Sequence, residues 1–280
     1  MQDSNFHSHC TYCDGHAEAE AFVKSAIDKQ FRAYGFSSHS PLPFRTIWNM
    51  NAEDMDTYIK EVNDLKHKYA NEIEVYCGLE IDYLSDQYNA SSAYFTSLPL
   101  DYRIGSLHFM TQDTAYKQLV CIDGPFSEFK QNVDEYYGGD VHALIKHYYE
   151  SMSKMVEAGC FDFVGHLDKI YMNASGYQEF DVTAKQYTSQ VTDLLHLIKE
   201  KNQMIEINTK VLNKKAMLFP HQQFFDTIKQ LEIPLMVNSD SHYPELVNDG
   251  RAQVLQLLKE AGINTTVELS QGEWKEFEIK

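Results

Sequence analysis

Short apolar segments alternate with amphipathic segments along most of this 280-residue chain. The apolar segments expected to form strands span residues 4–7, 33–39, 73–81, 102–110, 161–165, 204–208 and 233–238. Apolar residues recur at helical spacing over residues 18–30, 55–69, 141–158, 182–201, 221–231 and 247–261. Strands that alternate with helices in this way predict an α/β protein with a parallel sheet, which we expect to close into a barrel.

The pattern shows no linker or internal repeat, so we expect residues 1–280 to form a single domain. Two stretches interrupt the alternation, at residues 111–140 and 170–180. The first contains Cys121-Ile122-Asp123-Gly124-Pro125 and Gly138-Gly139, and both stretches follow strand ends that carry a histidine. Long loops in compact domains are often functional, so we expect inserted loops at the carboxyl ends of the strands. The polar, extended segment after Gly262 has no place in this scheme.

Composition and charge limit the classes of function. The chain has 24 basic and 41 acidic residues, which gives a formal net charge of −17. Such a surface repels nucleic-acid backbones, so we expect no nucleic-acid partner. Bound divalent cations would offset part of this charge locally and would attract a small anionic substrate. No apolar run approaches the ~20 residues that a membrane-spanning helix requires, so we expect no membrane association.

Cysteine usage predicts a reducing compartment. The five cysteines are widely spread, and no signal-peptide pattern precedes the first motif, so we expect a reduced, cytoplasmic protein. Cys10 and Cys13 form a C-x-x-C pair. Because no second pair accompanies them, a structural role is favoured over metal ligation.

Histidine and carboxylate residues stand at the ends of the predicted strands. They are His7, His9, His39, Glu80, His108, His166, Asp240 and His242. The carboxyl ends of barrel strands meet on one face, so these side chains should converge there. Alternation along an extended segment places His7 and His9 on the same side, and it does the same for Asp240 and His242. A lone histidine is more often a core or surface residue, but two such pairs with a carboxylate favour a site for several Zn²⁺, Fe²⁺ or Mn²⁺ ions.

The same residues lie in segments that resemble the ordered motifs of the polymerase and histidinol phosphatase (PHP) family. These segments are His7-Ser8-His9, Ser38-His39, Gly78-Leu79-Glu80, Ser106-Leu107-His108, Gly165-His166 and Asn238-Ser239-Asp240-Ser241-His242. The resemblance covers nearly the whole chain. Together with the opening motif, His39-Ser40-Pro41-Leu42-Pro43 is most similar to the histidinol-phosphate phosphatase branch.

This resemblance implies a distorted (β/α)7 TIM-like barrel that binds three divalent metal ions (Zn, Fe or Mn). The first metal would take His7, His9, Glu80 and Asp240, and the second would share Glu80 as a bridge with His108 and His166. The third would take His16, His39 and His242. The segment Asp14-Gly15-His16 departs from the family's variable first loop. Asp14 is therefore open to interpretation as a ligand, a proton carrier or a turn residue.

The implied activity is hydrolysis of L-histidinol phosphate in histidine biosynthesis, by attack of a metal-bridging hydroxide on phosphorus. Glu80 would act as the bridging ligand, and Asp14 or His242 would protonate the leaving alkoxide. For phosphate binding we consider Arg45, in the proline-containing loop, and Lys210, after the strand that ends at Asn208.

Two alternative functions are considered: a phosphoesterase of the same family that acts on nucleotides or phosphotyrosine, and a non-catalytic metal-binding barrel. The acidic charge disfavours a nuclease, and the complete ligand set disfavours a silent barrel. The sequence leaves the oligomeric state and the native metals open.

Overall fold

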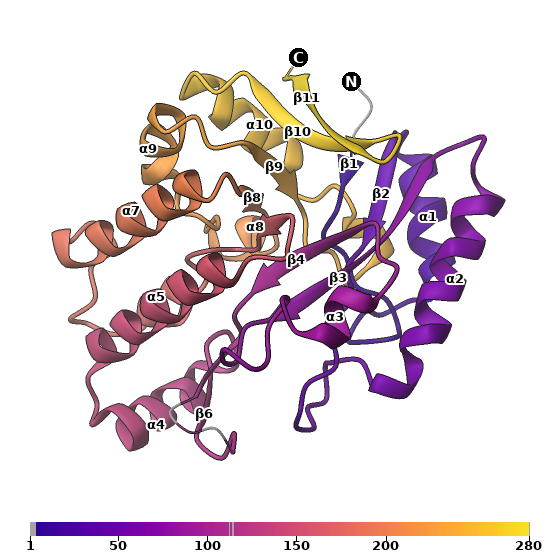
Figure 1. The fold of residues 1–280 in the computed structure, drawn as a ribbon. Coiled ribbons are helices and arrows are strands. Elements are labelled where there is room, and N and C mark those ends of the chain that lie inside the picture. The colour runs from indigo at the N-terminus through magenta and orange to yellow at the C-terminus, as the bar shows by residue number, and fades with distance from the viewer. Residues whose placement is uncertain (1–3, 112, 114, 280) are drawn as a thin grey trace.

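The main sheet of the computed structural model, which describes residues 4–111, 113 and 115–279, has seven strands, all parallel (Figure 1). In order across the sheet they are β1 (Ser4–Asn5), β2 (Ala33–Phe36), β3 (Glu74–Asp82), β4 (Tyr102–Ser106), β7 (Phe163–Val164), β8 (Met204–Asn208) and β9 (Leu235–Asn238). A parallel bridge joins Ser8, just after β1, to Ser241, just after β9, and the His9 amide donates to the Ser241 carbonyl at 2.9 Å. The sheet is thus nearly closed, which confirms the predicted distorted (β/α)7 barrel.

Helices pack around the outside of this sheet (Figure 1). The longer ones are α1 (Ala19–Asp28), α2 (Met55–Lys68), α5 (Val141–Ala158), α7 (Lys185–Glu200) and α10 (Arg251–Glu260). Shorter ones are α3 (Ala93–Ser97), α6 (Tyr171–Ala174), α8 (Leu212–Lys215) and α9 (Phe225–Gln230), with 3-10 turns η1 (Ala52–Asp54), η2 (Gln222–Phe224) and η3 (Pro244–Leu246). Each long helix buries one apolar stripe, as its sequence period requires.

Alternation along β3 separates the packing residues from the functional ones. Cys77, Leu79 and Ile81 belong to the apolar cluster formed with α1 and α2. Gly78 lies against the Tyr102 ring, so closely that a Cβ there would be 2.4 Å from the ring. Successive strand residues point to opposite faces, so Glu80 and Asp82 share the inward side with Gly78. The Tyr102 ring therefore fills the barrel directly below the layer that carries Glu80.

The first interruption, residues 111–140, forms elements of its own. The predicted strand 102–110 stops at Ser106, and β5 (Phe109–Thr111) pairs with β6 (Leu119–Cys121) in a separate antiparallel hairpin. Gln112 and Thr114, between these strands, lie outside the described residues. After them comes α4 (Phe126–Tyr137), which packs on α5. This hairpin and helix begin immediately after His108, beside the carboxyl ends of the strands.

The tail forms an antiparallel hairpin, β10 (Thr265–Ser270) and β11 (Glu273–Glu278), beside β9 (Figure 1). It lies by the first residues of the strands: Arg32, before β2, pairs with Glu268, and the Gln271 amide donates to Glu74 in β3. Trp274 adds its ring to a cluster with Phe6 and Tyr102. The hairpin closes the amino-terminal end of the barrel, opposite the predicted site. Among the described residues, no helix is long and apolar enough to cross a lipid bilayer.

Candidate metal centre

The Glu80 carboxylate lies at the centre of five imidazole rings. Its Oε2 atom is 3.2 Å from His7 Nε2, 3.5 Å from His9 Nε2 and 2.9 Å from His39 Nδ1. Its Oε1 atom is 2.9 Å from His166 Nε2 and 3.5 Å from His108 Nε2. All of these side chains are buried. The convergence expected from the sequence is therefore present in the structure, and each Glu80 oxygen faces a different group of histidines.

Several of these ligand atoms are buried without a hydrogen bond. Examples are His7 Nε2, His9 Nε2, His39 Nδ1, His108 Nε2 and Glu80 Oε2. A buried polar atom that lacks a partner costs free energy, so native proteins seldom tolerate one without a functional reason. Here the unpaired atoms face each other in overlapping groups whose members lie within 4.8 Å. Imidazole nitrogens and carboxylate oxygens in this arrangement fit divalent transition metals.

Asp240, two residues after the end of β9, extends the cluster. Its Oδ1 atom is 3.2 Å from His9 Nε2 and 3.8 Å from His7 Nε2. Asp240 and His166 both have positive φ angles, 47° and 22°. Side chains other than glycine rarely adopt this backbone region, and such strain concentrates at functional sites.

Carboxylates behind the histidines orient the rings. Glu206 in β8 contacts His7 Nδ1 at 2.9 Å, and Asp82 in β3 contacts His108 Nδ1 at 3.0 Å. A metal-binding histidine usually donates its other ring N–H to such a group, which fixes the tautomer. Burial lowers the pKa of His108, but Asp82 and Glu80 outweigh it and raise the value to about 9. Glu206 and Asp82 were not predicted from the sequence, although each is a buried carboxylate within a predicted strand or directly after it.

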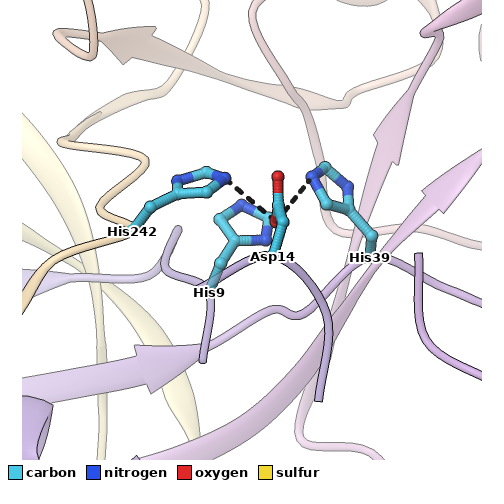
Figure 2. Close-up of side chains that lie close together, drawn as sticks. All are labelled: His9, Asp14, His39 and His242. Carbon is cyan, nitrogen blue, oxygen red and sulfur yellow. Dashed lines mark ion pairs between the residues drawn. The ribbon is translucent and has the colours of Figure 1, made fainter. Parts of the chain in front are cut away.

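The first loop brings Asp14, and not His16, to the third group of histidines (Figure 2). Asp14 Oδ1 lies 3.2 Å from His242 Nε2 and 3.7 Å from His39 Nε2. Burial would raise the pKa of Asp14, but the hydrogen bond from His242 and the charges of His39 and His9 hold it well below its usual range. This carboxylate is thus suited to a metal ligand.

The prediction that His16 joins this group is corrected by the structure. The ring of His16 is exposed and stacks on Tyr243, with centroids 4.2 Å apart and planes 8° apart. A tight turn causes this, because the Cys13 and Gly15 amides both donate to the Cys10 carbonyl. A Cβ at Gly15 would be 2.3 Å from the His9 carbonyl oxygen, so only glycine allows the loop to approach this closely.

Two lysines flank Asp240. Lys210, which the sequence proposed for phosphate binding, has its Nζ 3.1 Å from Asp240 Oδ1 and 3.3 Å from His242 Nε2. Lys169 is buried, 3.9 Å from Asp240 Oδ2 and 2.9 Å from Asp123 Oδ2. Lys169 was not predicted from the sequence, although it lies only three residues after His166. A cavity of about 230 Å³ beside Lys210 is lined by Asp14, Asp240 and His242, among others.

The remaining candidates lie outside the cluster or at its edge. Arg45 is exposed, and among the described residues no hydrogen bond or ion pair joins it to the metal ligands. In the same loop, the Trp48 ring covers His39 and His108, at centroid distances of 4.6 and 5.4 Å. Cys13 Sγ is 3.5 Å from His9 Nδ1, so this thiol helps to orient the imidazole ring of His9 and is not itself among the ligand groups.

A nearly closed parallel barrel that buries histidines and carboxylates at the carboxyl ends of its strands defines a metal-binding α/β barrel protein. Within this class the chain belongs to the PHP family, because the PHP domain matches residues 5–210.

Curated relatives and solved structures agree with this assignment. The histidinol-phosphatase of Bacillus subtilis is 24% identical over 260 residues, covering 86% of this chain and 94% of that protein. A probable histidinol-phosphatase of Deinococcus radiodurans is 25% identical and covers 92% and 94%. A putative histidinol phosphatase structure from Listeria monocytogenes has a TM-score of 0.79 at 23% identity, covering 90% and 99%. The histidinol phosphate phosphatase of Lactococcus lactis, complexed with zinc, L-histidinol and phosphate, has a TM-score of 0.77 at 20% identity, covering 98% and 99%.

Proposed function

We propose that this protein is a metal-dependent phosphomonoesterase that hydrolyses L-histidinol phosphate to L-histidinol and phosphate. The observation that carries the proposal is the buried cluster of unpaired ligand atoms around Glu80. Membership of the PHP family supports metal-dependent hydrolysis. The curated relatives that align along nearly their full length are histidinol-phosphatases, which supports the choice of substrate.

The geometry supports three metal positions. His7, His9, Asp240 and one oxygen of Glu80 would hold the first metal, and His108, His166 and the other oxygen of Glu80 would hold the second. Asp14, His39 and His242 would hold the third, with Asp14 in the place that the resemblance gave to His16. Bound divalent ions would make a water molecule acidic enough to attack near neutral pH and would neutralise phosphoryl charge. Zinc, iron and manganese all suit this donor set.

The residues of the chain supply the remaining functions. Lys210 lines the cavity beside His242, where its ammonium group can hold a phosphoryl oxygen. Lys169 is the second cation within reach of that oxygen, because it lies on the other side of Asp240. The low pKa of Asp14 keeps its carboxylate ionised, which suits a metal ligand and disfavours it as the acid that protonates the leaving alkoxide. His242, which contacts Asp14 and lines the same cavity, stays the candidate for that role. Arg45 stays a candidate for phosphate binding from its exposed loop.

Phosphate release from a panel of substrates tests the proposal. Metal-loaded protein is assayed with L-histidinol phosphate, a nucleoside monophosphate, a phosphotyrosyl peptide and an aryl phosphate. We expect kcat/KM for L-histidinol phosphate to exceed the others by at least about tenfold, which corresponds to about 1.4 kcal/mol of selective binding. Similar rates for all substrates would refute the substrate assignment. No release from any of them would favour a non-catalytic barrel.

A further inference from the structure

An ion pair at the edge of the metal centre joins a buried lysine to a partly exposed aspartate, and neither is among the predicted metal ligands. Lys169 Nζ lies 2.9 Å from Asp123 Oδ2, and the side chains are 4% and 23% exposed. Lys169 also approaches Asp240 Oδ2, at 3.9 Å. Lys169 therefore stands between a predicted metal ligand and the carboxylate of Asp123, and it places Asp123 next to the reaction centre.

Hydrogen bonds hold the backbone in place on both sides of Asp123. The amide of Ile122 donates to the carbonyl of His108 at 2.9 Å, which ties the segment to a predicted ligand. The buried side chain of Asn173 donates to the carbonyls of Ile122 and Gly124, at 2.9 and 3.0 Å. The backbone position of Asp123 is therefore fixed on both sides, whereas Lys169 reaches its carboxylate through a flexible four-carbon stem.

The Asp123 carboxylate retains capacity to accept more hydrogen bonds. Among the described residues, its polar contacts are Lys169 at Oδ2 and the Cys121 thiol, 3.4 Å from Oδ1. A carboxylate offers about four acceptor positions, so an additional donor can bind without displacing the existing ones. Its partial exposure leaves room for that donor to approach.

We propose that Asp123 binds the ammonium group of the substrate while Lys169 turns to the phosphoryl oxygens. This inference rests on the proposed function. L-Histidinol phosphate carries an anionic phosphate and a cationic ammonium group, separated only by a short O–C–C linkage. The Lys169–Asp123 pair presents the complementary cation and anion, also side by side. Binding exchanges one ion pair for two, so no charge is buried without a partner.

A pair of substrates that differ only in the amine tests this proposal. Metal-loaded wild type and Asp123→Asn are assayed with L-histidinol phosphate and with its deamino analogue, 3-(imidazol-4-yl)propyl phosphate. We expect the substitution to lower kcat/KM about tenfold to a hundredfold more for the amine-bearing substrate, chiefly through KM. Asp134→Asn, which alters an exposed carboxylate on α4 paired with Lys130, is the matched control and should behave as wild type.

Equal losses on both substrates, or no loss on either, would overturn the role of Asp123. A measurement on wild type covers the case in which Asp123→Asn fails to fold: competitive inhibition by L-histidinol should be at least about tenfold stronger than by the deamino alcohol. Equal inhibition would also overturn the proposal. Failure of the proposed function has a different signature, namely wild type that prefers another phosphate ester while Asp123→Asn still alters the amine preference.

Discussion

The two ends of the barrel both bury charged groups, but they satisfy them differently. At the amino-terminal end, Glu268 accepts from Arg32 at 2.7 Å and from Arg251 at 3.3 Å, and its side chain is 3% exposed. At the carboxyl-terminal end, Glu80 is equally buried, yet its Oε2 atom and several facing histidine nitrogens lack hydrogen bonds. The two carboxylates are thus similarly buried, but both oxygens of Glu268 are paired with arginines, whereas among the described residues only Oε1 of Glu80 has a hydrogen bond, to His166.

This difference separates stability from function. A buried carboxylate between two guanidinium groups locks the tail hairpin to the barrel, and removing it would take the shared carboxylate partner from both arginines. A buried carboxylate that faces several ring nitrogens without hydrogen bonds contributes little to the fold in the absence of metal, but it is suited to bind one. We therefore expect substitutions at the two ends to act on different observables.

The largest effect should come from Glu80→Ala. Loss of the carboxylate that both groups of histidines face should lower kcat at least about a thousandfold, or about 4 kcal/mol in activation free energy. Metal content should fall with it, while far-UV circular dichroism of the metal-free protein should match wild type. Near-normal turnover would contradict the shared-metal arrangement.

Glu268→Ala should lower stability and leave activity nearly unchanged. It leaves Arg32 and Arg251 without their shared carboxylate, so we expect the free energy of unfolding to fall by about 3–5 kcal/mol. Below the melting temperature, kcat should stay within about twofold of wild type, because a substitution far from reacting groups alters stability and not chemistry. Denaturant titration measures the first quantity. Glu273→Ala, an exposed position on the same hairpin, is the control and should change little.

Metal removal should destabilise only a protein with an intact Glu80. Metal held at about a hundred times its dissociation constant stabilises the native state by about 2.7 kcal/mol. Chelation should accordingly lower the melting temperature of wild type and Glu268→Ala by about 5–10 °C. Scanning calorimetry of Glu80→Ala should show a much smaller shift. An equal shift in that variant would mean that the stabilising metal binds elsewhere.

The smallest effects distinguish Asp14 from His16. Asp14→Ala should lower kcat about tenfold to a hundredfold and weaken binding of one metal, because it removes one ligand from the third group. His16→Ala should leave activity within about twofold, since its ring lies on Tyr243 and not among the ligands. Steady-state kinetics with metal analysis makes the comparison, and the opposite ranking would restore His16 as the ligand.

Regular elements with a strong hydrophobic period could be predicted from the sequence. The bounds of α5 and β8 agree with the expected 141–158 and 204–208. Helix α4 was missed because Pro125 before it and Gly138 after it were interpreted as loop residues. In the structure Pro125 is the N-cap and Gly138, with φ of 62°, is the C-cap. The tail hairpin was missed because its Gln271-Gly272 turn joins strands with mostly polar outer faces.

The strand-borne part of the site was predictable for a similar reason. A residue at the carboxyl end of a barrel strand has one direction to point, which fixes His7, Glu80 and Asp240 together. Asp14 and His16 lie in a loop, where backbone hydrogen bonds to Cys10 determine which side chain faces the histidines. Asp123 and Lys169 could not be paired from the sequence, because they belong to separate loops that meet only in the folded barrel.

The number of divalent metal ions bound per chain tests the central claim most directly. Elemental analysis of protein purified without chelators, and again after reconstitution, gives this number beside a sulfur-based protein concentration. The unpaired ligands around Glu80 predict two to three equivalents of zinc, iron or manganese in wild type and a marked loss in Glu80→Ala. Fewer than one equivalent after reconstitution would contradict the assignment of these residues as a metal centre.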